Sequence, residues 1–110
     1  MRVALYMKSN NPVYADAMKE LDDQLQSMWR YCREQGWDVV DYYPNDSKRK
    51  CLDSLMRNAR LGTFDIVLVT NPTVLSNNLD ELARLVGTLE DSGVRLRFAE
   101  NAKAVGFVLG

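Results

Sequence analysis

The stretch Phe64–Asn78, FDIVLVTNPTVLSNN, decides the fold of this chain. It opens with the apolar run Phe64–Val69, which is typical of a strand buried on both faces of a parallel sheet. A polar connection with a proline follows, and Asn78 with Glu81 resembles a capping box at the start of a helix. The stretch therefore predicts a buried strand that leads, through a short loop, into a helix.

Strand patterns recur on both sides of this stretch. The predicted strands are residues 3–6, 37–43, 64–69 and 94–98, and Ala104–Leu109 is a candidate fifth. Pro44-Asn45-Asp46-Ser47 is typical of a turn after the second strand. These segments predict a sheet of four strands, or of five if the last segment joins it.

Apolar residues with helical spacing lie between the strands. The first helix has an apolar face from Met18 to Cys32 and is closed by Gly36, and the second covers residues 52–59. The third begins after Asn78 and has a buried stripe predicted at Leu79, Leu82, Val86 and Leu89. Because strands and helices alternate with short connections, the sequence predicts a three-layer α/β/α domain with a mainly parallel sheet.

The composition limits the chemistry available to this domain. The chain has 110 residues, a net charge of −1 and no histidine, so the commonest general base and metal ligand is missing. Cys32 and Cys51 are too few and too far apart for a zinc site, and they favour a reducing compartment. Neither a signal peptide nor a membrane-spanning run is present in the sequence, so we expect a cytoplasmic protein without a metal.

Two polar segments follow predicted strands at the positions where open α/β sheets bind ligands. They are Lys8–Asn11 and Thr70–Thr73. Neither contains the glycines that a phosphate-binding loop or a dinucleotide fingerprint needs, so we expect no cofactor.

Several segments together resemble the N-terminal catalytic domain of the serine recombinases, the resolvase and invertase family. The matching positions are Arg2–Met7, Gln24, Tyr31, Gly36–Val40, Ala59–Val69 and Gly93–Leu96, so the resemblance spans about residues 2 to 100. It implies the resolvase fold and a role in DNA recombination, as in mobile elements.

The departures from this family fall in its catalytic motifs. The family's first motif is Tyr-x-Arg-Val-Ser, in which the serine attacks a DNA phosphodiester, and this chain has Tyr6-Met7-Lys8-Ser9-Asn10. Lys8 keeps a cation but cannot replace arginine at a bidentate phosphate site. Asn10 has no nucleophilic oxygen, and Ser9 lies one residue early. If β geometry continues to that point, Ser9 faces the opposite side of the strand from Asn10.

The second family motif, Asp-Arg-Leu-Ser-Arg-Asn, has lost its charges. It corresponds to Thr73–Asn78, which keeps the leucine, the serine and the final asparagine but lacks the acid and both arginines. The resemblance therefore implies a degenerate active site in which Lys8, Ser9 and Asn10 stand at the catalytic positions. Lys8, Asn71 and Thr73 are the candidates for contacting a phosphate or another anion.

Three hypotheses follow from these residues. The first is a catalytically inactive serine-recombinase domain that acts as an interaction or regulatory module. The second is an active recombinase domain that uses Ser9 as a shifted nucleophile. The third is a small anion-binding module that reuses the two polar segments, although turn formation and helix capping explain Ser76, Asn77 and Asn78 better than a ligand does.

The family also sets expectations about partners. In the family a long dimer-forming helix and a DNA-binding region follow this domain, and residues 1–110 contain neither. We therefore expect a homodimer or a recombinase as partner, DNA contact only through a further domain, and no membrane contact.

Overall fold

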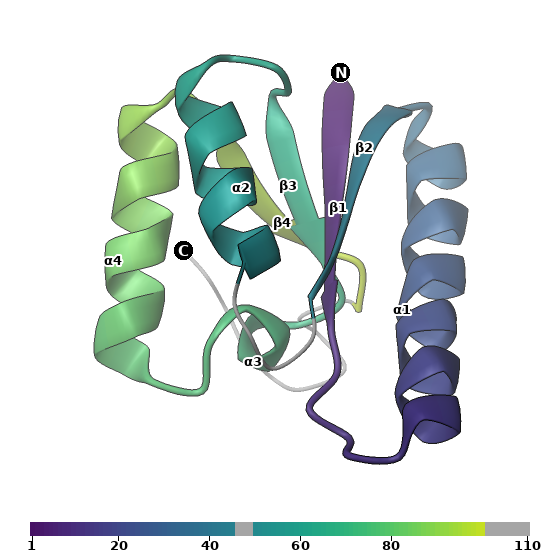
Figure 1. The fold of residues 1–110 in the computed structure, drawn as a ribbon. Coiled ribbons are helices and arrows are strands. Elements are labelled where there is room, and N and C mark those ends of the chain that lie inside the picture. Colours follow the sequence, from purple (N-terminus) through teal and green to yellow (C-terminus); the bar gives the residue numbers. More distant parts are fainter. Residues whose placement is uncertain (46–49, 101–110) are drawn as a thin grey trace.

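The computed structural model describes residues 1–45 and 50–100 of the chain (Figure 1). Strands and helices alternate along it. The strands are β1 (Arg2–Lys8), β2 (Asp38–Asn45), β3 (Ile66–Val69) and β4 (Arg95–Phe98). The helices are α1 (Tyr14–Gln35), α2 (Lys50–Arg60), α3 (Pro72–Leu75) and α4 (Leu79–Asp91).

The four strands form one parallel sheet in the order β2-β1-β3-β4. The chain places β2 on one side of β1 and then crosses to β3 on the other side, so the strand order reverses between β1 and β3. Helix α1 covers one face of the sheet, and α2 and α4 cover the other (Figure 1). The predicted three-layer α/β/α architecture is confirmed.

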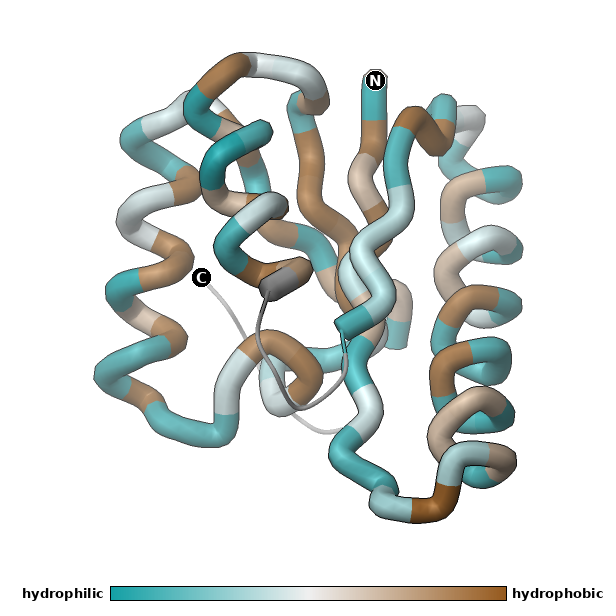
Figure 2. The backbone as a smooth tube through the Cα atoms, viewed as in Figure 1, coloured by the Kyte–Doolittle hydropathy of each residue, from teal (hydrophilic) through white to brown (hydrophobic). Residues whose placement is uncertain are grey.

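The central strand β1 divides the core into two halves, because successive side chains of a strand point to opposite faces. Val3, Leu5 and Met7 belong to the apolar cluster beneath α1, whereas Ala4 and Tyr6 belong to the cluster beneath α2 and α4. The neighbouring strand β3 is buried along its whole length and is hydrophobic throughout in Figure 2. Both faces of the sheet are therefore covered, as the apolar run in the sequence indicates.

The helix ends follow the expected chemistry. Helix α1 ends at Gly36, whose φ of 71° lies in the left-handed region that favours glycine. At the start of α4 the Asn78 side chain accepts from the Glu81 N–H at 3.0 Å, and the Asn78 N–H donates to Ser76 Oγ at 3.0 Å. In the part of the chain that the structure describes, no helix has the length and apolar character needed to span a membrane.

The predicted turn at Pro44–Ser47 is wrong in its first half. Strand β2 continues through Pro44 and Asn45, which lie opposite Met7 and Lys8 of β1. A proline is tolerated there because β2 is an edge strand among the described residues, where the missing N–H breaks no bond to a further strand. The second half of that turn, residues 46–47, and the candidate fifth strand, Ala104–Leu109, lie outside the described residues.

The predicted buried stripe of α4 is wrong at its first and third positions, because neither Leu79 nor Val86 is among the apolar residues that contact the core cluster. Leu89 is fully buried and Leu82 packs against the core, but Leu79 is 81% exposed. Leu79 opens the helix and is not among the apolar residues that contact the core cluster. The first turn of α4 therefore presents a large apolar side chain to solvent.

Candidate functional site

The carboxyl ends of β1 and β3 lie side by side where the strand order reverses. This is the position at which open α/β sheets bind ligands. The loop after β1 carries Ser9, Asn10 and Asn11, and the loop after β3 carries Thr70 and Asn71. The two segments predicted to form a crevice are thus placed at one edge of the sheet, with α3 packed beside β1.

Lys8 is anchored at this edge through its backbone. Its N–H donates to Gln24 Oε1 at 3.0 Å, and its carbonyl accepts from Gln24 Nε2 at 2.8 Å, so one side chain of α1 clamps the end of β1. By strand alternation the Lys8 side chain shares the face of Tyr6, beneath α2 and α4. The side chain is half-buried, and its ammonium group forms no ion pair with any described residue.

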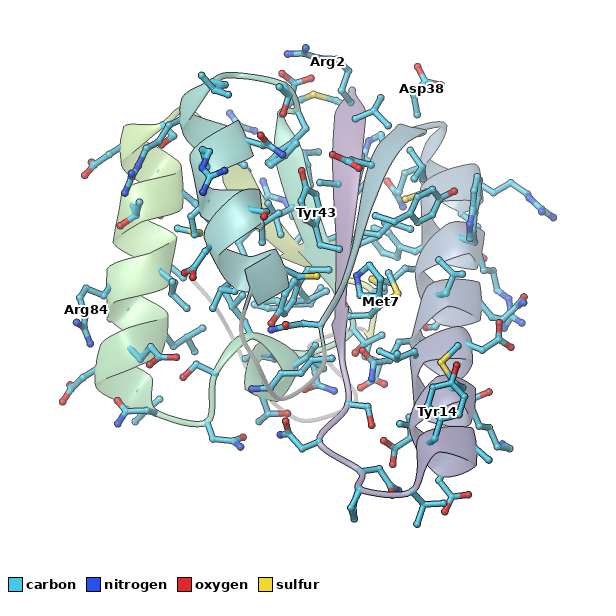
Figure 3. The ribbon with its side chains drawn as sticks, in the orientation of Figure 1. Arg2, Met7, Tyr14, Asp38, Tyr43 and Arg84 are labelled. Atoms are coloured by element: carbon cyan, nitrogen blue, oxygen red, sulfur yellow. The ribbon has the colours of Figure 1, made fainter. Side chains whose placement is uncertain are left out.

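Ser9 lies on the opposite face, which α1 covers. It follows Val3, Leu5 and Met7 in the alternation of β1, and Figure 3 shows Met7 directed towards α1. Its N–H still pairs with the Asn45 carbonyl at 3.2 Å, so the extended geometry continues one residue beyond the strand. The serine is only 7% exposed, and its hydroxyl is turned away from the face that carries Lys8.

The Ser9 hydroxyl is fully engaged by neighbouring groups. Its Oγ donates to the carboxylate of Glu20 on α1 and accepts from the Asn11 N–H at 3.2 Å. The Asn11 amide also donates to Glu20 at 3.3 Å, which closes a small polar cluster. The cluster fixes the connection between β1 and α1. Asn10, at the position of the family's nucleophile, is exposed, and its side chain has no hydrogen bond to any described residue.

A buried polar pair beside Lys8 was not predicted from the sequence. Asn45 is 1% exposed, and its Nδ2 donates to the Tyr6 hydroxyl at 2.8 Å across the two strands. The other amide atom, Oδ1, is buried without a hydrogen-bond partner among the described residues. The alternation of Tyr43 and Asn45 on one face of β2 is the signal that points to this residue, and it is hidden by the turn-like composition around Pro44.

The polar side chains of the loop after β3 form hydrogen bonds within the loop and with neighbouring residues. The Asn71 side chain accepts from the Thr73 N–H at 3.1 Å and from the Thr73 hydroxyl, and so caps the short helix α3. The Asn71 amide donates to Glu100 at 3.2 Å. Further along, Ser76 Oγ accepts from the Asn78 N–H. Turn formation and capping therefore engage the side chains of Asn71, Thr73 and Ser76.

The described residues at this edge carry charges of both signs. Lys8 is accompanied by the carboxylates of Glu20 and Glu100, both in hydrogen bonds with polar groups of the two loops. Among the described residues, no group of three or more histidine, cysteine or acidic side chains is arranged to hold a metal ion. Among the described residues, the Lys8 cation therefore lies on one face, and the Ser9 hydroxyl, paired with the Glu20 carboxylate, lies on the other.

The groups with raised pKa values belong to the core. Burial raises the pKa of the Cys32 thiol to about 11. Burial, together with the hydrogen bond that its hydroxyl donates to Asp41 at 2.6 Å, raises the pKa of Tyr43 to about 12. Tyr43 lies on the α2 side of the sheet in Figure 3. Both groups therefore stay protonated at neutral pH and supply no nucleophile.

Comparisons with known proteins agree with this architecture. The sequence pattern of the family described as "Resolvase, N terminal domain" matches residues 13–106. Against curated protein sequences the chain has no significant match.

Three solved structures show the same fold. The catalytic domain of ISC1926 TnpA, an IS607-like serine recombinase, superimposes with a TM-score of 0.81 at 19% identity, over 94% of this chain and 73% of that one. The N-terminal catalytic domain of TP901-1 integrase gives 0.81 at 22% identity, over 90% and 78%. A resolvase family site-specific recombinase from Streptococcus pneumoniae gives 0.82 at 19% identity, over 91% and 72%.

Proposed function

Because this chain belongs to the resolvase N-terminal domain family, we propose that it is a serine-recombinase domain that no longer cleaves DNA and acts in recombination by binding other proteins. The family places the domain in DNA recombination. The proposal concerns the role that the domain keeps in recombination when its catalytic groups are absent.

One observation carries the proposal: the Ser9 hydroxyl donates to Glu20 on the α1 face, while Lys8 belongs to the other face. A phosphodiester that approaches Ser9 would meet a carboxylate at hydrogen-bond distance, and like charges repel strongly away from bulk water. Lys8 extends from the other face of the strand, so it does not stand beside Ser9 to stabilise charge on the phosphate oxygens. The geometry therefore argues against Ser9 as a shifted nucleophile.

The absence of the family's arginines also argues against DNA cleavage by this chain. Attack on a phosphodiester adds negative charge to the phosphate oxygens, and in a serine recombinase arginines stabilise this charge. Removing one preorganised donor commonly raises a barrier by roughly 2.7–4 kcal/mol. Val74 and Asn77 stand where the family has arginines, and Thr73 stands where it has an acid. Such losses are not additive, but a single lysine on the strand cannot offset them.

The proposed partners are a second copy of this chain or an active recombinase, since the fold is retained without the chemistry. The test is sedimentation of the purified protein, first alone and then with the catalytic domain of an active serine recombinase from the same cell. We expect a species of higher mass in at least one of the two samples. A protein that stays monomeric in both, at concentrations well above those in the cell, would refute the interaction role.

The rival reading of an active domain needs its own test. If Ser9 were the nucleophile, Ser9→Ala would abolish strand cleavage without changing the fold. Our proposal predicts that the parent protein and the Ser9→Ala variant give the same result, with no cleavage by either.

A further inference from the structure

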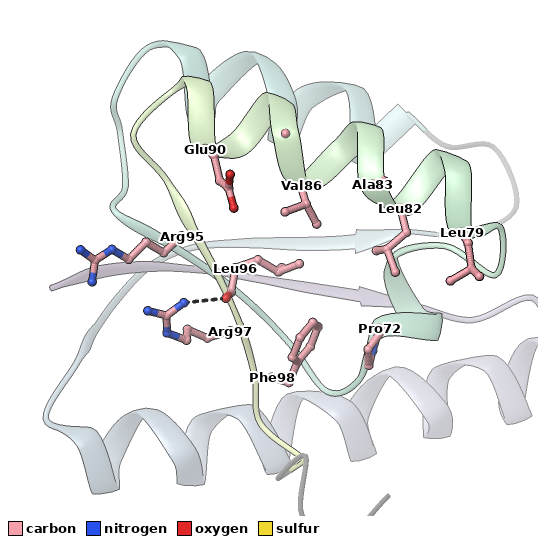
Figure 4. A pocket seen from close by; sticks show the side chains of 11 residues that line it. Pro72, Leu79, Leu82, Ala83, Val86, Glu90, Arg95, Leu96, Arg97 and Phe98 are labelled. Carbon is pink, nitrogen blue, oxygen red and sulfur yellow. Dashed lines mark hydrogen bonds between the residues drawn. The ribbon is translucent and has the colours of Figure 1, made fainter. Parts of the chain in front are cut away.

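Apolar side chains gather near both lateral ends of the described sheet. At one end, a groove of about 630 Å³ lies between α4 and β4, where Leu82 and Val86 face Leu96 and Phe98 (Figure 4). That groove adjoins β4, which residues 101–110 follow directly, outside the described part of the chain. The second surface lies on α1 and β2, at the opposite end of the described sheet.

One side of α1 carries apolar residues that the core does not cover. Met18, Leu25 and Trp29 follow one another at spacings of seven and four, which places them within about 40° around the helix. Leu25 packs against the core, but Met18 and Trp29 are exposed, Trp29 to 40%. The ring of Trp29 contacts that of Tyr42 on β2, with centroids 6.3 Å apart, and Tyr42 is exposed as well. We call these four side chains the α1–β2 patch.

The patch lies away from the points at which the undescribed segments leave the described chain. Residues 46–49 begin at the carboxyl end of β2 and lead to α2 on the other face of the sheet. Trp29, by contrast, lies in the last third of α1, and Tyr42 shares the α1 face with Leu5, its neighbour on β1. Residues 101–110 follow β4, which lies three strand spacings, about 14 Å, from β2.

Two opposite charges flank the patch along α1. Asp22 and Arg33 are 11 positions apart, close to three helical turns, so they project from the same side of the helix about 16 Å apart. Around the helix both lie next to Trp29, on the side that faces solvent. Both are exposed, and neither forms an ion pair within the described part of the chain. A carboxylate and a guanidinium are therefore available to a partner.

A second copy of α1 in the opposite direction matches this charge pattern. In a symmetric dimer each contact occurs twice, once in each direction. If two α1 helices lie side by side and antiparallel, Asp22 of each copy faces Arg33 of the other when the two-fold axis passes the midpoint between these residues. That midpoint lies beside Trp29, so Trp29 and Tyr42 of both copies meet at the axis. A parallel pair would instead bring like charges together, and flanking charges of this kind set helix orientation.

We propose that this chain forms a symmetric homodimer through the α1–β2 patch, with Trp29 and Tyr42 of both copies at the centre and two reciprocal Asp22–Arg33 ion pairs at the margin. Tryptophan, tyrosine and arginine are the residues that most often dominate interface energetics. The patch is small for a permanent interface, so the dimer dissociates on dilution. This inference rests on the proposed interaction role and names the partner and the surface.

A charge exchange tests the ion pairs. Sedimentation equilibrium of the full chain over a range of concentrations should show monomer and dimer. Asp22→Arg would set arginine against arginine, and Arg33→Asp would set carboxylate against carboxylate, so each variant alone should dimerise at least about tenfold more weakly. An equal mixture of the two variants should recover the dimer, because both arginines of one copy then face both carboxylates of the other.

Two further variants test the aromatic centre. Trp29→Gln should weaken the dimer about tenfold, because it removes the ring at the axis. Tyr14→Ser is the matched control: Tyr14 is 78% exposed, four positions before Met18 on the same helix, but lies about 20 Å from the axis. Its replacement should change dimerisation less than about twofold. All variants should keep the circular dichroism spectrum of the parent.

The outcomes separate this inference from the proposed function. A full chain that stays monomeric at its highest soluble concentration, single variants that the mixture does not rescue, or equal effects of Trp29→Gln and Tyr14→Ser would overturn the inference. None of these results would restore DNA cleavage or exclude association with an active recombinase, which sedimentation of the mixed proteins measures separately. Conversely, cleavage of DNA by this chain would refute the proposed function and leave the dimer result standing.

Discussion

Removing the clamp that Gln24 forms on Lys8 should destabilise the fold at the candidate site. Gln24→Met keeps the length of the side chain and has nearly the same helix propensity, so the main change is the loss of two hydrogen bonds, at 3.0 and 2.8 Å. Each such bond contributes a net 0.5–1.5 kcal/mol, which gives about 1–3 kcal/mol in the free energy of unfolding. For a domain near this size, that corresponds to a fall in Tm of about 4–8 °C per kcal/mol.

The same helix offers a matched control. Gln26 is exposed and has no side-chain hydrogen bond to a described residue, so Gln26→Met should change stability by less than about 0.5 kcal/mol. Urea unfolding followed by circular dichroism measures both variants. If Gln24→Met is no more destabilising than Gln26→Met, the clamp contributes nothing and our account of how β1 is positioned is refuted.

Three further predictions concern other polar groups. Tyr6→Phe deprives the buried Asn45 amide of its partner and should cost about 1–3 kcal/mol in urea unfolding, whereas Tyr42→Phe, at a ring 45% exposed, should cost almost nothing. Hydrogen bonds from Arg2 hold the pKa of Asp65 below its usual range. The stability that this pair contributes is therefore present above the pKa of aspartate in the unfolded chain, and it is lost as the pH falls through the pKa of Asp65 in the folded protein. An NMR titration should show that low pKa, and Arg2→Ala should raise it. Because burial raises the pKa of Cys32 to about 11, a thiol reagent at mildly alkaline pH should label Cys51 in the native protein and reach Cys32 only after unfolding.

The sequence was sufficient for the architecture because each element carries its own signal. The apolar run of β3, the helical spacing of α1 and the glycine at position 36 each depend on local chemistry, and the structure contains all three. The errors arose where tertiary context overrides local preference. Pro44 has the composition of a turn but lies in an edge strand, and Leu79 fits an apolar stripe but has no core to contact.

The candidate site was harder to predict because it depends on partners distant in sequence. The opposite faces of Lys8 and Ser9 follow from strand alternation, and their positions agree with that rule. The engagement of Ser9 by Glu20, by contrast, requires the placement of α1 against the sheet, which no motif encodes. The Tyr6–Asn45 pair joins residues 39 positions apart and depends on the register of β1 and β2.

The central claim is that this domain does not cleave DNA, and a search for a covalent protein–DNA species tests it most directly. The purified chain is incubated with total DNA of its source cell, denatured, and analysed for protein that remains attached to DNA, with an active serine recombinase on DNA that carries its own site as positive control. Our account predicts no attached protein, since Ser9 is paired with Glu20 and the arginines of the family are absent. A covalent species that disappears in the Ser9→Ala variant would contradict it.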